Sequence, residues 1–348
     1  IREMKKKENE WNNIKNGLHI DSTDTVVSLC YRHLEYQVSN NDLKGKSIDR
    51  RECTIENQIS GYDLGYLQAQ QVTPIDIETH VKLLISENKV GASSIGKVVD
   101  VLNAAYEWAI RQGDMQQNPV RLVKTELSKK LKKLSVKGAD EADVVALSDE
   151  EIKLFEQEAT ELHANGHEKY PAGMYCLLLL HTGMRVGEMI ALRWRDWKGD
   201  YLVIEKSVST AKNRNKKSED ENNYISLEGN TKNQKARNIQ LNREAKYILW
   251  KLKHSRESCE QDDLIVPTKT GKMNTASNLE HCMKVIMKNA GLEDVKGGLH
   301  IFRKTFATKM YENGARVEEI AAYIGDLPST TQKYYIAIRR KGVADGET

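Results

Sequence analysis

One short segment of the chain places an arginine where it must meet an anion or stay in water. Residues 182–188 read Thr-Gly-Met-Arg-Val-Gly-Glu, and they follow the apolar run 176–180, Cys-Leu-Leu-Leu-Leu. A helix that apolar is buried on most sides, so Arg185 is expected at a turn just past a rigid buried element. Glu188 lies one helical turn further on, and an Arg185–Glu188 pair at i,i+3 spacing is the ordinary explanation, of small energetic worth.

Three further groups have the side-chain types needed for acid–base, nucleophilic or anion-binding chemistry. They are Lys232 at the tip of a predicted hairpin, His300 with Arg303 one helical turn later, and the late pair Tyr334-Tyr335. Each also has an ordinary explanation, because exposed lysine is common, a His and an Arg at this spacing can pair locally, and tyrosines in a helix usually pack. Taken singly, none of these groups identifies a function.

The first half of the chain is predicted to be a small bundle of about four helices. Thr73 and Pro74 mark a helix start, as N-cap and first helical residue. The clearest apolar stripe at helical spacing opens at Ser93 and stops at Gly113. The lysine-rich stretch 125–145 is interpreted as a basic linker, since charge runs are usually solvated.

The second half is predicted to combine helices with a small antiparallel sheet. A capping box at Ser148 and Glu151 starts it. Alternating, β-branched segments predict strands at 201–206, 224–227 and 236–241, with a loop at 212–223 and a turn at 229–230. Helices are predicted at 243–252, 278–287, 304–311 and 317–324. The expected fold is therefore mainly α with a small antiparallel β-sheet.

The expected domain boundaries follow from these elements and from changes in composition. Residues 1–23 are interpreted as a tail or the remnant of a preceding module, and 341–348 as a C-terminal tail. Between them lie three predicted parts, a helical domain, the basic linker and an α+β domain, at 24–124, 125–145 and 146–340.

The composition predicts a cytoplasmic protein with only local basic surfaces. The chain of 348 residues is 39% hydrophobic and 30% charged, its apolar runs are too short to span a membrane, and no secretory signal is visible. Five scattered cysteines are typical of reduced thiols rather than of disulfides or a zinc site. A net charge of only +3 means that any nucleic-acid partner must be held by a local patch.

Together, the candidate groups resemble the catalytic domain of the tyrosine recombinases, the phage and transposon integrases. The family's first arginine box, Thr-Gly-x-Arg-x-x-Glu, is matched at 182–188, and its second, His-x-x-Arg, is matched by His300 and Arg303. Lys232, which precedes the strand 236–241, is similar to the family's hairpin lysine. The first half also resembles the family's helical core-binding domain.

The resemblance implies a role for each group in cutting a phosphodiester without a metal or another cofactor. Arg185 and Arg303 would clamp the two non-bridging phosphate oxygens, because the planar guanidinium binds them bidentately. Lys232 would protonate the leaving 5′ oxygen, and His300 would support the phosphate. Glu188 would hold Arg185 in place. A tyrosine would attack phosphorus and form a covalent phosphotyrosine.

The late part of the chain matches the family less closely. Asp326 stands at a catalytic position where the family has His or Trp, and its carboxylate would repel a phosphate unless it points away or orients a neighbour. Counting nine residues from Asp326 selects Tyr335 as the nucleophile. Counting from the Thr-Thr pair at 330–331 selects Tyr334 instead. Tyr335 is preferred because it requires no deletion.

The resemblance also implies partners. We expect double-stranded DNA recombination sites, held by a C-shaped clamp of the two domains, and a homotetramer on synapsed DNA, with an accessory excision factor as a further partner and no membrane association. The expected host is a bacterial mobile element. The basic stretch would contact the DNA backbone through four lysines, Lys129, Lys130, Lys132 and Lys133.

Three other functions are compatible with parts of this pattern. A type IB topoisomerase would use the same groups but relax supercoiled DNA of any sequence. A DNA-binding regulator on the same fold would never form a covalent complex, and the carboxylate of Asp326 keeps this alternative open. A metal-dependent nuclease is the weakest alternative, because the sequence lacks a convincing acidic cluster.

Overall fold

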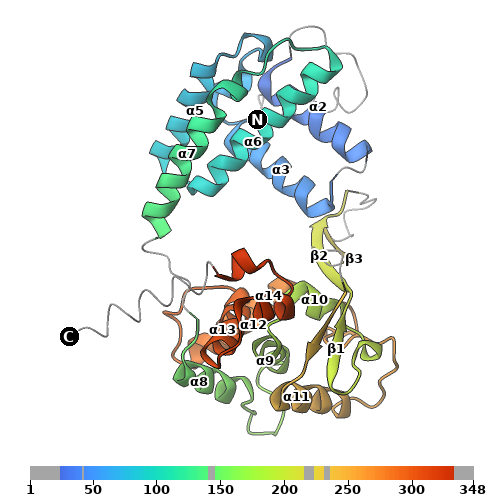
Figure 1. The fold of residues 1–348 in the computed structure, drawn as a ribbon. Coiled ribbons are helices and arrows are strands. Elements are labelled where there is room, and N and C mark those ends of the chain that lie inside the picture. Colours follow the sequence, from blue (N-terminus) through green and yellow to red (C-terminus); the bar gives the residue numbers. More distant parts are fainter. Residues whose placement is uncertain (1–23, 41–42, 140–145, 215–222, 231–235, 333–348) are drawn as a thin grey trace, which may run out of the picture. The chain divides into compact units, whose positions relative to one another are not determined.

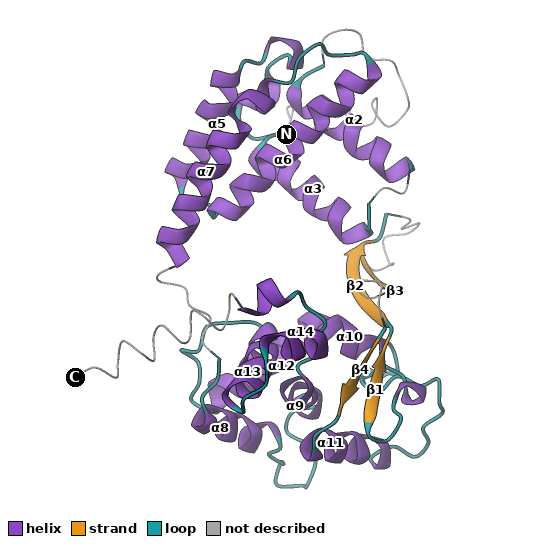
Figure 2. Cartoon of the chain, in the orientation of Figure 1, coloured by secondary structure: helices purple, strands orange, loops and turns teal. Residues whose placement is uncertain are grey.

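The computed structural model divides the chain into two compact units, residues 1–143 and 144–348. It describes residues 24–40, 43–139, 146–214, 223–230 and 236–332. Over these ranges the chain is mainly helical with short antiparallel strands, which confirms the predicted fold class (Figure 1, Figure 2). No helix in the described part is both long and apolar enough to cross a membrane.

The first unit is built of helices around a central one, α6. Its elements are α2 (Val26–Ser39), α3 (Gly45–Gln58), the short α4 (Asp63–Tyr66), α5 (Pro74–Glu87), α6 (Ala92–Gln112) and α7 (Pro119–Ala139). Helix α6 packs against α2, α3 and α7, and its predicted apolar stripe is buried. The predicted caps are confirmed, since Thr73 accepts from Asp76 N and Gly113 ends α6 in the left-handed region.

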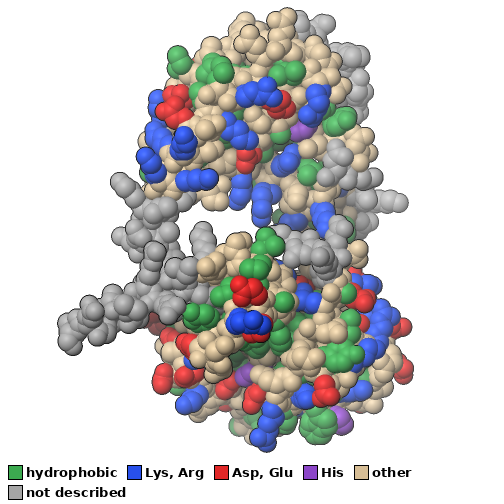
Figure 3. Space-filling model, viewed as in Figure 1, with side chains coloured by type: hydrophobic (Ala, Val, Ile, Leu, Met, Phe, Trp, Pro, Cys, Tyr) green, Lys and Arg blue, Asp and Glu red, His purple; other side chains and the backbone are tan. Residues whose placement is uncertain are grey.

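Helix α7 replaces most of the predicted linker, up to Ala139. The linker interpretation gave too much weight to the lysines. Leu127 and Leu131 are buried and continue the stripe of Val120 and Val123 at helical spacing, against α5 and α6. Burial of such a stripe stabilises a helix more than a few charged neighbours destabilise it. The four lysines of the predicted DNA-contacting stretch are all exposed on α7, and Figure 3 shows basic side chains on this unit.

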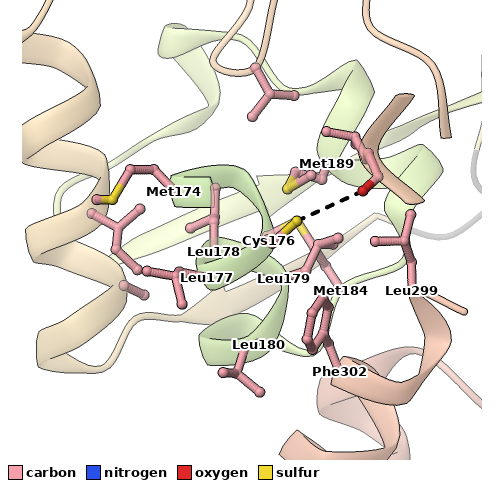
Figure 4. Packing of buried hydrophobic residues seen from close by; sticks show 14 of the residues in the cluster. Met174, Cys176, Leu177, Leu178, Leu179, Leu180, Met184, Met189, Leu299 and Phe302 are labelled. Carbon is pink, nitrogen blue, oxygen red and sulfur yellow. Dashed lines mark hydrogen bonds between the residues drawn. The ribbon is translucent and has the colours of Figure 1, made fainter. Parts of the chain in front are cut away.

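The second unit is organised around the apolar helix α9 (Gly173–Thr182). This helix packs against α8 (Asp149–Ala159), α11 (Arg243–His254), α12 (Ala276–Asn289) and α13 (His300–Glu312). Figure 4 shows the leucines of α9 surrounded by other apolar side chains, among them Met189 and Phe302. This unit also contains α10 (Val186–Ala191) and α14 (Val317–Ile324). The predicted capping box at Ser148 and Glu151 is present at the start of α8.

The strands form two antiparallel pairs. Strand β1 (Tyr201–Ile204) pairs with β4 (Arg237–Gln240), and β2 (Lys206–Lys212) pairs with β3 (Tyr224–Asn230). Sequence reasoning missed β2, and it was wrong about the turn at 229–230, where Gly229 and Asn230 pair with Ser207 and Lys206. The β2–β3 ribbon is largely exposed, so it lacks the buried alternation from which strands are predicted.

Candidate active site

Arg185 lies at the turn between α9 and α10, as predicted. Gly183 ends α9 with φ +62°, and a Cβ atom there would lie 2.5 Å from the Phe306 ring. The chain then restarts as α10, with Arg185 as its N-cap. The Arg185 backbone N–H donates to Glu188 Oε2 at 2.9 Å, and its Nη1 donates to Oε1 at 3.0 Å. The local Arg185–Glu188 pair that is expected from their i,i+3 spacing is therefore present.

Arg185 also reaches a segment far away in the sequence. Its Nη2 donates to the Gly325 carbonyl oxygen and to Asp326 Oδ1, each at 2.8 Å. Gly325 ends α14 in the left-handed region, at φ +69°. The turn after α14 thus brings the Asp326 carboxylate onto the Arg185 guanidinium, so Asp326 does not point away from the site.

The second predicted arginine shares the same carboxylate. Arg303 lies in the first turn of α13, which begins at His300 and therefore starts four residues before the predicted helix. Its side chain is 3% exposed. Arg303 Nη1 donates to the Gly183 carbonyl at 2.9 Å, and Nη2 donates to Asp326 Oδ2 at 2.5 Å. Arg185 and Arg303 therefore each hold one oxygen of Asp326.

A third arginine, which sequence reasoning did not include among the site residues, completes the cluster. Arg237 at the start of β4 donates through Nη1 to Glu188 Oε1 at 2.9 Å and through Nη2 to Oε2 at 2.6 Å. The Glu188 side chain is 1% exposed. The available signal was the strand alternation, because Arg237 precedes the buried Ile239 by two residues and so shares its inward face.

The charges of the cluster fix its protonation states. Burial on its own raises the pKa of Asp326, but the hydrogen bonds and charges of Arg303 and Arg185 outweigh it, so this pKa lies below its ordinary value. Burial likewise raises the pKa of Glu188. The hydrogen bonds and charges of Arg237 and Arg185 lower it by more, so the pKa of Glu188 also lies below its ordinary value. Both carboxylates are therefore ionised at neutral pH, and three guanidinium groups share them.

His300 stands next to these cations. Its pKa is lowered, first by loss of solvent and then by the positive charges of Arg303 and Lys304, while Asp326 acts in the opposite sense. The imidazole is therefore neutral at pH 7 and able to accept a proton.

Comparison with known proteins shows the family to which the chain belongs. The family model described as the phage integrase family matches residues 146–340, more than half of the chain. The chain belongs to the phage integrase family. The predicted membership of the tyrosine recombinases, which are site-specific DNA strand-transferases, is confirmed.

Curated relatives support this assignment along most of the chain. The XerC-like tyrosine recombinase of Caldanaerobacter subterraneus is 23% identical over 340 residues, covering 92% of this chain and 81% of that protein. The XerD tyrosine recombinase of Proteus mirabilis is 25% identical over 278 residues, covering 77% of this chain and 76% of that protein.

Solved integrase structures share the fold. The Tn1549 transposon integrase in complex with transposon right end DNA is similar with a TM-score of 0.69 at 16% identity, over 93% of this chain and 100% of that one. A λ integrase dimer bound to a core site gives a TM-score of 0.61 at 17% identity, over 88% of this chain and 94% of that one. The likeness extends over both units of this integrase-family chain.

Two sets of predicted site residues remain. Lys232, Tyr334 and Tyr335 lie outside the described residues, so their roles stay predictions. The four exposed lysines of α7 belong to the first unit. The structure therefore unites Arg185, Glu188, His300, Arg303 and Asp326, and it adds Arg237.

Proposed function

We propose that this chain is the integrase of a mobile element, which cleaves and rejoins DNA through a covalent 3′-phosphotyrosine. The observation that supports the proposal best is that Arg185 and Arg303 each donate a hydrogen bond to one of the two oxygens of Asp326. A carboxylate and a phosphodiester each present two adjacent anionic oxygens. Two guanidinium groups that converge on the first are preorganised for the second.

In the proposed reaction, the scissile phosphate displaces Asp326 from the arginines. The Tyr335 oxygen forms a bond to phosphorus while the bond from phosphorus to the 5′ oxygen breaks. Arg185 and Arg303 stabilise the negative charge that develops on the phosphorane oxygens. Each such preorganised donor typically contributes about 3–4 kcal/mol of transition-state stabilisation. Because the bond energy is retained in the phosphotyrosine, rejoining requires no ATP.

Two side chains would move the protons. Lys232 donates a proton to the leaving 5′ oxygen, which becomes a hydroxyl group. His300 is neutral at pH 7 because its pKa is lowered, so it supports the phosphate and is able to receive the proton of the attacking tyrosine. Glu188 orients Arg185 throughout.

The proposed DNA complex uses both units and several copies of the chain. The two units close on duplex DNA as a clamp, with Lys129, Lys130, Lys132 and Lys133 of α7 on the backbone. The λ integrase has been solved as a tetramer bound to a Holliday junction, which supports a homotetramer on synapsed sites. An accessory excision factor is part of the proposal for the direction of the reaction.

A suicide DNA substrate, nicked beside the scissile phosphate, tests this function. Wild-type protein should give a protein–DNA adduct on a denaturing gel, Tyr335→Phe should give none, and Tyr334→Phe should give one. Adduct from Tyr335→Phe but none from Tyr334→Phe would assign the nucleophile to Tyr334. DNA binding without any wild-type adduct would mean a regulator, and relaxation of any supercoiled plasmid would favour a topoisomerase.

A further inference from the structure

Arg237 contacts both Glu188 and the C-terminal end of α14. It donates three hydrogen bonds among the described residues, two to Glu188 and one, from Nε, to the Tyr323 carbonyl at 3.1 Å. Its side chain is 13% exposed. We propose that Arg237 is a positioning residue that sets the place and the effective charge of Arg185. This inference rests on the proposed function of Arg185 as a phosphate ligand.

The first path from Arg237 to Arg185 runs through Glu188. Both Glu188 oxygens are held by the fork of Arg237, and the same oxygens accept from the Arg185 backbone N–H and Nη1. A carboxylate held at both oxygens has one orientation only. Glu188 therefore presents a fixed surface to Arg185.

The second path runs through the end of α14. The Nε bond to Tyr323 ties Arg237 to this helix, and a Cβ atom placed on Gly325 would lie 2.9 Å from the Arg237 guanidinium. Gly325 is thus seated against Arg237. Its carbonyl oxygen accepts from Arg185 Nη2, and the next residue is Asp326. The Gly325 carbonyl, to which Arg185 donates from outside its own turn, is therefore held in place by Arg237 as well.

The charge balance gives Arg237 a further effect. If Arg185 were the only cation beside Glu188, the negative charge of Glu188 would neutralise the positive charge of Arg185, which we propose as a phosphate ligand. Arg237 supplies a second cation to Glu188 at short distance. Arg185 then keeps a net positive field toward the position of Asp326, where the phosphate is proposed to bind.

The test compares Arg237→Gln and Arg237→Lys with Arg316→Gln. Arg316 pairs with Glu319 at the same i,i+3 spacing as Arg185 and Glu188, but on the exposed start of α14, so it is the matched control. Each protein is assayed for DNA affinity, for melting temperature, and for the single-turnover rate of adduct formation at saturating suicide substrate. The assays are repeated with a methylphosphonate at the scissile position, which removes one anionic oxygen and with it part of the need for Arg185.

Arg237→Gln should slow adduct formation on the natural phosphate by about 100-fold, the order of loss for a catalytic group displaced by about 1 Å, with little change in DNA affinity. On the methylphosphonate, the ratio of the wild-type rate to the Arg237→Gln rate should be smaller than on the natural phosphate. Arg237→Lys keeps the charge without the fork, so its loss should be smaller. Arg316→Gln should match wild type on both substrates.

Two results would overturn the inference. One is a wild-type rate from folded Arg237→Gln. The other is an equal loss on both substrates, in proportion to lost DNA affinity or thermal stability, which is the signature of a structural defect. If Arg237→Gln does not fold, Arg237→Lys carries the same comparison. Since every rate is measured against wild-type adduct, absence of that adduct contradicts the proposed function instead.

Discussion

Arg185 Nη2 and Asp326 Oδ1 lie 2.8 Å apart, although 141 positions of the chain separate the two residues. The same carboxylate is bound to the buried Arg303 through its other oxygen. The two arginines that we propose as phosphate ligands are therefore bound to a side chain of the protein itself. This relationship makes Asp326 the residue whose replacement is most informative.

Asp326→Asn should strengthen DNA binding and weaken the fold. The change removes the internal anion that competes with the phosphate, so the dissociation constant for a core-site duplex should fall. It also removes charge-assisted hydrogen bonds to two arginines, which should lower the free energy of unfolding at pH 7 by about 1–3 kcal/mol. Fluorescence anisotropy and denaturant unfolding measure the two effects. Weaker DNA binding together with unchanged stability would contradict this account.

The stability contributed by Asp326 should depend on pH in one direction. Its pKa in the folded protein lies below the ordinary value of 3.8, so the folded state binds this proton less readily than the unfolded state. The contribution is fully present above that ordinary value and is lost as the pH falls through the lower folded value. The difference in unfolding free energy between wild type and Asp326→Asn should therefore shrink as the pH falls from about 5 to about 2, a range set by the reference pKa of carboxyl groups. A difference independent of pH would mean that the charge is not responsible.

Replacement of either clamp arginine by alanine should remove cleavage while DNA binding persists. Arg185→Ala and Arg303→Ala should each slow adduct formation by about 100- to 1000-fold, since each removes one preorganised donor. Only Arg303 is almost fully buried, so its replacement should also lower the melting temperature more. Gel-shift, adduct and thermal-unfolding assays separate these effects. A near wild-type rate from either variant would remove that arginine from the clamp.

Gly325→Ala should impair the site beyond its cost in backbone strain. The residue has φ +69°, and the added methyl group would meet the Arg237 guanidinium at 2.9 Å. Gly314 is the matched control, with φ +87° and no atom within 4 Å of the added carbon. Each alanine should cost about 1–2 kcal/mol of stability through its left-handed backbone. Only Gly325→Ala should also slow adduct formation, and equal rates from both variants would show that the contact with Arg237 is dispensable.

The lysines of α7 should contribute to DNA affinity without regard to sequence. Replacing Lys129, Lys130, Lys132 and Lys133 with Gln should weaken specific and random duplexes alike. The slope of log K against log salt should flatten by about 0.9 for each DNA phosphate that the variant no longer neutralises. Replacement of the exposed Lys82 on α5 serves as the control for a general charge effect. An unchanged slope would mean that these lysines only solvate the helix.

The sequence predicted those parts of the site that are encoded locally. The sequence indicated the place of Arg185 at a break after an apolar helix, and the spacing of His300 and Arg303 one turn apart. Both features depend only on neighbours in the chain. The capped helix starts at Thr73 and Ser148 are confirmed for the same reason. Local rules of capping and spacing act over three or four residues, which is the range that a single sequence displays.

Other features depend on contacts across the chain, which local patterns do not display, although the strand alternation did indicate that Arg237 faces inward. Arg237 belongs to the site only because β4 passes beside Glu188 and Tyr323. The direction of Asp326 depends on the packing of α14 against α13. The helix α7 was missed because the lysines obscured two buried leucines, whose partners lie in α5 and α6.

The tethered carboxylate of Asp326 has a consequence for small anions. A group attached to the same folded chain competes at an effective concentration in the millimolar range or above, however dilute the protein is. Free sulfate or inorganic phosphate, each making only the contacts of one ion, would have to exceed that concentration to take its place. In the proposed complex, a phosphate within duplex DNA arrives together with many backbone contacts, which would supply binding energy for displacing Asp326. Under the proposed function, the two guanidinium groups would therefore favour an anion that belongs to a polymer over a free one.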